Sequence, residues 1–296
     1  MKTFKILLLF VISFSLIGCA SAQIKKRNTT EKSKNTNVKT NNKTANNKPM
    51  SVETKSLAEG AYSKVEEPFV FVAREQETYA QLQSIVENLP SASEIDFSKS
   101  AVVAAFAGTK NSGGYSVSIK NSAGKVLIEM INPPKDAMVT QVITTPFNVA
   151  LIPLEENNSV NLELSANWKN AMQTYKIASG TFEYSGGIAG MRKEFGAEGA
   201  ISILSFGNYA TLVFNLAGKG ANKNMKLADT ASGSVKGGKI ELARLGAGSF
   251  SENPKPPLKV SGTMTNGKLS LAFEPFPSRV ADGFQARGKV EAVKTK

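Results

Sequence analysis

Residues 258–273 read LKVSGTMTNGKLSLAF, and this stretch decides the fold of the C-terminal half of the chain. Residues 258–265 and 268–273 each alternate with a period of two, which is typical of β-strands. Asn266-Gly267 lies between them and is a strong signal for a two-residue hairpin turn, because both residues tolerate a positive φ. The stretch therefore predicts an antiparallel hairpin.

The same pattern continues on both sides of this hairpin. Further alternating segments cover residues 174–184, 200–206, 209–217, 232–235, 239–245 and 284–293. Gly207-Asn208 and Gly237-Gly238 are additional two-residue turn signals. Around eight strands joined locally predict an antiparallel β-meander over residues 170–296, and closure into a barrel would remove its edges.

A different pattern, with one helix, predicts an α+β domain over residues 57–165. Apolar residues recur at helical spacing through residues 74–89, and Pro90 is expected to end that helix. The unbroken apolar run 101–107 predicts a strand buried on both faces. Further strands are expected at 69–72, 115–120, 125–131 and 160–164, with one or two more in 139–154 around Pro146. The expected architecture is mainly β, with the helix packed on one antiparallel sheet of four to six strands.

Residues 109–120, TKNSGGYSVSIK, contain two adjacent glycines, Gly113 and Gly114, followed by Tyr115 and an alternating strand. A phosphate-binding loop needs a different glycine spacing and a helix after the loop, so both common nucleotide motifs are excluded. The segment predicts a tight turn in which a glycine takes positive φ.

The N-terminal residues 1–22 have the features of a signal peptide, with Lys2 and Lys5 before a short apolar run. Leu16-Ile17-Gly18-Cys19 is similar to a bacterial lipobox, so Cys19 is the expected lipidation site. Ordinary secretion with cleavage after Ala22 is the alternative. Either route takes the mature protein out of the cytoplasm. The first predicts an anchored protein of the cell envelope that faces the periplasm, and the second predicts a secreted protein.

The positive charge is concentrated at the N-terminus. The chain carries +12 overall, and residues 1–56 hold eleven Lys and Arg against two Glu, which is +9 and leaves +3 for the remainder. Residues 23–56 are rich in Asn, Lys and Thr and are expected to be a disordered basic tether. A nucleic-acid-binding domain would carry its charge on a folded face, so no nucleic-acid partner is expected.

Histidine is absent and Cys19 is the only cysteine. Catalysis by Ser-His-Asp or Cys-His groups and zinc sites of His and Cys are therefore excluded. We expect no enzymatic activity, no cofactor and no metal, although an enzyme that uses carboxylates alone remains a third hypothesis.

Residues 66–155 contain a series of short motifs: Phe106–Gly108, Thr109–Ser112, Gly113-Gly114-Tyr115, Pro133-Pro134, Gln141 and Thr144-Thr145-Pro146-Phe147. As a set, these motifs make the segment resemble the C-terminal domain of the PrcB family of protease-complex subunits. The chain has Phe147 where the family commonly has tyrosine, and its turn lacks the family's proline. The resemblance implies a lipoprotein that binds or stabilises an envelope protease complex without catalytic residues of its own.

Two functions follow as expectations. The first is a non-enzymatic accessory subunit that binds an envelope protein partner, such as a protease, and attaches to the membrane through its lipid anchor. For it, we expect Gly113, Gly114, Tyr115 and the bend Thr145-Pro146-Phe147 to form one contact patch, although a purely structural role for these residues is the alternative. The second is a lipocalin-like carrier that holds a small hydrophobic ligand in the C-terminal β domain.

Overall fold

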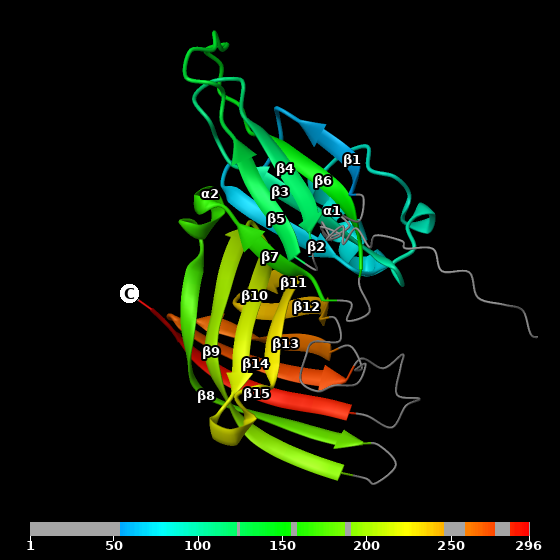
Figure 1. Cartoon of the computed structure of the whole chain (residues 1–296), viewed down its shortest axis with the longest axis vertical. Coiled ribbons are helices and arrows are strands. Elements are labelled where there is room, and N and C mark those ends of the chain that lie inside the picture. The colour runs from blue at the N-terminus through cyan, green and yellow to red at the C-terminus, as the bar shows by residue number, and fades with distance from the viewer. Residues whose placement is uncertain are drawn as a thin grey trace, which may run out of the picture. The chain divides into compact units, whose positions relative to one another are not determined.

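The computed structural model describes residues 54–122, 125–154, 159–186, 191–245, 258–275 and 285–295 (Figure 1). The predicted signal peptide, Cys19 and nearly all of the predicted tether lie outside the described residues. Neither helix within the described ranges is long and apolar enough to cross a membrane.

The first sheet has four antiparallel strands in the order β1-β6-β3-β2. Their bounds are β1 Lys55–Gly60, β2 Pro68–Ala73, β3 Ser100–Ala107 and β6 Phe147–Pro153. Seven of the eight residues of β3 are buried, which confirms the prediction of a strand covered on both faces. The sequence pattern did not indicate β1, which begins inside the segment expected to be the tether.

The helix α1, Gln76–Ile85, follows β2 and buries Tyr79 and Leu82 in the same core. It ends earlier than predicted. Val86 is already extended, and Asn88 takes a φ of 59°. Leu89 is nevertheless partly buried against the core, so its apolar character reflects packing of the chain after the helix. A 3₁₀ turn, η1 Ala92–Glu94, precedes β3.

A second sheet corrects the prediction of a single antiparallel sheet. It contains β4 Ser116–Ser122, β5 Lys125–Ile131 and β7 Asn161–Leu164, with β4 and β5 antiparallel but β5 and β7 parallel. Strand β4 contacts β3 and β6 of the first sheet. The parallel pair arises because the chain passes through β6 in the other sheet before it returns as β7, and such a crossover connection is what parallel strands require.

The C-terminal part is a closed antiparallel barrel of eight strands, and all eight predicted strands are present. The strands are β8 Gln173–Gly186, β9 Met191–Phe206, β10 Tyr209–Gly218, β11 Lys226–Lys236, β12 Lys239–Leu245, β13 Leu258–Thr265, β14 Lys268–Pro275 and β15 Gln285–Lys294. A 3₁₀ turn, η2 Gly220–Asn222, joins β10 to β11. Both residues of Asn266-Gly267 have positive φ, 51° and 73°, as the predicted hairpin turn requires.

Large apolar side chains from several strands fill the described part of the barrel core. The Phe182 ring lies 5.0 Å from the Phe273 ring and 5.9 Å from the Phe195 ring, measured between centroids. Gly288 makes room for them, because a Cβ at that position would lie 2.4 Å from the ring of Phe182.

Side chains of the barrel cap the free edge of β2. Ser232 Oγ accepts a hydrogen bond from Val72 N at 2.8 Å, and Thr211 Oγ1 donates to Val70 O. Thr211 and Ser232 lie opposite each other on β10 and β11. Their hydroxyls therefore satisfy backbone groups that an edge strand would otherwise leave open.

A buried ion pair lies beside this edge. The Arg74 guanidinium donates to both carboxylate oxygens of Asp229 and to Thr230 O, and neither charged side chain is more than 3% exposed. The backbone N–H groups of Val160 and Thr230 donate to Asp229 Oδ1 at 2.9 and 2.7 Å. One carboxylate thus joins the end of β2, the start of β7 and the middle of β11.

The helix α2, Ala166–Lys169, leads into the barrel. Its Trp168 is fully buried, and the indole Nε1 donates to Phe106 O at 2.8 Å and to Phe69 O at 3.2 Å. The sole tryptophan therefore packs against the first sheet.

Candidate protein-binding surface

Residues 132–146 connect β5 to β6 without a strand of their own, and we call them the 132–146 loop. This corrects the prediction that the segment from residue 139 is already a strand. The loop and the residue before it carry large exposed apolar side chains. Met138 is fully exposed, Ile143 is 68% exposed, and Ile131 and Val142 are 45% and 43% exposed.

Backbone hydrogen bonds hold the 132–146 loop against the segment that contains the two glycines. Lys110 N donates to Thr144 O at 2.7 Å, and Thr144 N donates to Lys110 O at 2.9 Å. Gly113 N donates to Thr140 O at 2.9 Å, and Thr144 Oγ1 donates to Ser112 O at 2.8 Å. The loop is therefore fixed at several points, and its apolar residues are presented on a held backbone.

The two glycines allow this close approach. A Cβ at Gly113 would lie 2.4 Å from Thr140 Oγ1, and a Cβ at Gly114 would lie 2.9 Å from a side-chain carbon of Val139. Gly114 also has a φ of 86°, which confirms the prediction of a glycine with positive φ. The glycines belong to the connection between the two sheets and do not form a hairpin within one sheet. Tyr115, the next residue, is half-buried at the start of β4.

Thr145 and Pro146 fasten the other end of the loop. Thr145 Oγ1 accepts from Ser63 N at 2.6 Å and donates to Ser63 O at 2.8 Å, while Thr145 N donates to Ala61 O at 2.9 Å. Pro146 O accepts from Ala107 N at 2.8 Å. Both Thr145 and Pro146 are buried, so they fix the end of the loop to the underlying backbone.

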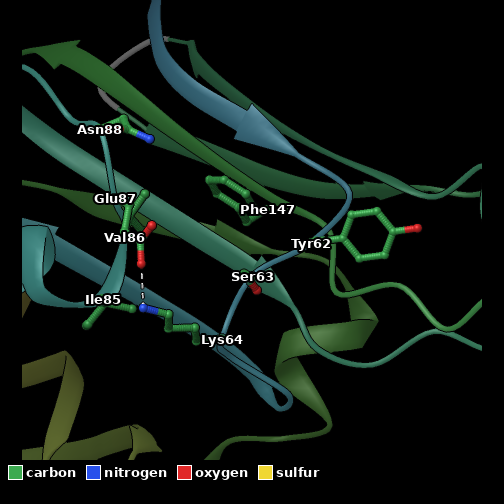
Figure 2. A pocket seen from close by; sticks show the side chains of 8 residues that line it. All are labelled: Tyr62, Ser63, Lys64, Ile85, Val86, Glu87, Asn88 and Phe147. Carbon is green, nitrogen blue, oxygen red and sulfur yellow. Dashed lines mark hydrogen bonds and ion pairs between the residues drawn. The ribbon is translucent and has the colours of Figure 1, made fainter.

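Phe147, the first residue of β6, is half-buried and lines a cavity of about 430 Å³ (Figure 2). Its ring stacks on Phe106 with centroids 6.1 Å apart. The cavity lies between residues 62–64, which follow β1, and residues 85–88, which follow α1. Figure 2 shows the Phe147 ring between these two segments, with Tyr62 turned away from it.

An ion pair joins the two chain segments that line this cavity. Lys64 Nζ lies 2.6 Å from Glu87 Oε1, and the two side chains are 70% and 72% exposed. The hydrogen bond from Lys64, together with its positive charge, lowers the pKa of the Glu87 carboxyl.

Lys110, whose backbone is bonded to Thr144, lies outside this cavity. Burial lowers the pKa of its side chain, and its Nζ donates to Asn167 Oδ1 at 2.9 Å.

The structure links the predicted patch residues but separates them into two groups. Gly113 and Gly114 support the 132–146 loop, whereas Thr145 bonds to Ala61 and Ser63 and Phe147 lines the cavity with residues 62–64. Pro146 bonds instead to Ala107. The bond pair between Lys110 and Thr144 connects the groups. Whether any of them contacts a partner stays a prediction.

The most exposed apolar residues, Met138 and Ile143, were missed in the sequence. Ile143 lies in the segment 139–154 that was predicted to contain one or two strands, and Met138 directly precedes that segment. Within the described residues, no group of three or more Asp, Glu, His or Cys side chains could hold a metal ion.

Comparison with known proteins covers the segment that builds this surface. No curated protein and no solved structure matches the chain. Residues 101–153, from β3 through β6, match the family model described as PrcB C-terminal, and this match confirms the resemblance of that segment to the PrcB C-terminal domain.

Proposed function

We propose that this protein is a non-enzymatic accessory subunit that binds a partner protein through the 132–146 loop, and that the partner belongs to a protease complex. The family match of residues 101–153 is compatible with a protease-complex subunit and supports this choice of partner. The matched segment includes the whole loop and the two glycines that support it.

One observation carries the proposal. Among the described residues, four of the six large hydrophobic side chains with high exposure are Ile131, Met138, Val142 and Ile143. Soluble proteins rarely expose a concentration of large apolar side chains on one segment unless it contacts a partner. The loop is also held by backbone hydrogen bonds on both sides, so it would lose little conformational freedom on binding.

The cell envelope is the proposed location, with the lipid anchor at Cys19 and residues 23–53 as the tether. The described chain starts at Thr54, whose hydroxyl accepts a hydrogen bond from Asn121 N near the end of β4. The 132–146 loop packs near the opposite ends of β1 and β4, at Ala61 and Gly114. A tether entering at Thr54 would leave the loop free to face a protein away from the anchor.

The carrier hypothesis remains a second candidate because the barrel is closed. Its described interior is occupied by buried side chains, including the Phe182, Phe195 and Phe273 rings, which favours the accessory-subunit proposal. Saturable binding of a fluorescent fatty acid to the purified protein, and loss of that binding when Phe214 inside the barrel is replaced by Trp, would support the carrier instead.

Affinity capture tests the proposal. The tagged full-length protein is isolated from detergent-solubilised envelope, and co-purifying proteins are identified by mass spectrometry. We expect a protease or a protease subunit with the wild type, and its loss with Met138→Asp/Ile143→Asp. Val293→Asp is the matched control, because Val293 is 45% exposed on β15 of the barrel.

The variants also separate contact from packing. Both loop substitutions are at exposed positions, so the melting temperature should not change. Recovery of the same protease by the loop variant and the wild type would contradict the proposal.

A further inference from the structure

The cavity beside Phe147 has the size and lining of a site for one large apolar side chain. Its volume of about 430 Å³ lies at the lower end of the range for small-ligand sites, and it has room for a large side chain. The partly exposed Phe147 ring and the side chains of Ile85 and Val86 supply apolar lining. An aromatic ring inserted here could pack against Phe147 in an offset or edge-to-face arrangement.

We infer that this cavity receives an aromatic or large aliphatic side chain from an extended segment of the partner protein. The inference rests on the proposed function and adds the chemistry of the contact. Binding energy in protein interfaces concentrates in a few large side chains that fill pockets, surrounded by contacts that exclude water. The cavity would be such a pocket, and the 132–146 loop would be part of its surroundings.

The charges around the cavity favour a neutral apolar occupant. Lys64 and Glu87 are the charged residues that line the cavity, and they are paired with each other at 2.6 Å. Their charges cancel, whereas residues 1–56 carry +9. An anionic lipid headgroup or polymer would therefore be attracted to the N-terminal segment, and this surface suits an uncharged side chain.

The cavity and the 132–146 loop are continuous through Thr145. Thr145 bonds to Ala61 and Ser63 on either side of Tyr62, and two residues earlier the chain exposes Ile143. Tyr62 is itself 65% exposed and lines the cavity. A single partner segment that places one side chain in the cavity would thus also reach Tyr62 and the loop, which are the positions where exposed apolar side chains concentrate.

A pair of substitutions at Lys64 tests the inference. Lys64→Trp replaces a side chain that lines the cavity with a large ring, and Lys64→Ala replaces it with a small one; both remove the ion pair with Glu87. The side chain is 70% exposed, so neither substitution should change the melting temperature. The probe is N-acetyl-phenylalanine amide, titrated into the full-length protein while the methyl NMR signals of Ile85 and Val86 are followed.

We expect saturable shifts of these methyl signals with a Kd of about 1 mM for wild type and Lys64→Ala, and at least tenfold weaker binding for Lys64→Trp. N-acetyl-glutamate amide should give no saturable shift. Absence of saturation by the phenylalanine probe, or equal binding by Lys64→Trp, would overturn the inference.

Partner capture distinguishes this inference from the proposed function. We expect Lys64→Trp to capture at least tenfold less protease than the wild type does, and Lys64→Ala to capture about as much as the wild type. If Met138→Asp/Ile143→Asp releases the partner but Lys64→Trp does not, the proposed function stands and the cavity is not a partner site. Probe binding in that case would assign the cavity to a free small molecule. If none of these variants releases the partner, both proposals fail.

Discussion

Removal of the Asp229 carboxylate should strongly destabilise the protein. In Asp229→Ala, the Arg74 guanidinium keeps its charge in a site where it is at most 3% exposed, and it loses both oxygens that accept its hydrogen bonds. The N–H groups of Val160 and Thr230 lose their bonds to the same carboxylate. Breaking a buried pair in this way typically costs about 3–5 kcal/mol, which is a large part of the roughly 5–15 kcal/mol that stabilises a folded domain.

Urea unfolding with two probes measures this loss. Trp168 is the only tryptophan and is buried against the first sheet, so its fluorescence reports that region, while far-UV circular dichroism also reports the barrel strands. We expect coincident transitions in the wild type, and in Asp229→Ala an earlier loss of the fluorescence signal.

Two controls make the experiment specific. Glu87→Ala removes an ion pair whose side chains are 70% and 72% exposed, and it should cost less than about 1 kcal/mol. Arg74→Met/Asp229→Leu removes both buried charges and should recover much of the lost stability. A decrease of less than about 1 kcal/mol in the free energy of unfolding of Asp229→Ala would refute the reasoning.

Three further predictions concern the glycines and a buried tyrosine. Gly114→Ala should lower the melting temperature more than Gly207→Ala, because both glycines have positive φ but only the first would meet a side chain, at 2.9 Å; equal effects would contradict the close approach of the loop. Gly288→Ala should destabilise the barrel, because it would place a Cβ 2.4 Å from an aromatic ring. The far-UV circular dichroism signal should therefore be lost at a lower temperature than in the wild type. Burial, and secondarily the charge of Glu94, raises the pKa of Tyr79 above 10.0, so its contribution to stability is complete below pH 10 and declines as the pH rises through the raised pKa. Tyr79→Phe should therefore lose less stability than the wild type between pH 9 and pH 11, and an equal loss would contradict this assignment.

The barrel could be predicted from the sequence because its information is local. Period-two alternation and two-residue turns such as Asn266-Gly267 specify each hairpin, and a meander of such hairpins pairs neighbours in order. All eight strands were therefore predicted, although β9 begins at residue 191 and β11 at residue 226, where residues 200 and 232 were predicted. Closure between β8 and β15 needs pairing over about a hundred residues, for example between Ser185 and Gln285, so the local pattern alone does not determine it.

The first sheets were harder to predict because their arrangement depends on distant pairing. No local signal in residues 108–115 reveals that β3 and β4 belong to different sheets. The apolar residues of 138–143 resemble a strand, yet Thr140 O accepts a hydrogen bond from Gly113 N and the next bonded residue, Thr144, pairs with Lys110. The side chains of Met138, Val142 and Ile143 remain exposed. The Arg74–Asp229 pair joins residues 155 positions apart, so no spacing rule could have found it.

The most direct test of the central claim places a photo-crosslinking amino acid at Ile143 or at Val293 in cells that express the full-length protein. Both side chains are exposed, at 68% and 45%, but only Ile143 lies on the 132–146 loop. We predict that illumination crosslinks the Ile143 variant to a protease-complex subunit and that the Val293 variant gives no such product. A crosslink to that subunit from Val293 alone, or from neither position, would contradict the claim that the loop binds the partner.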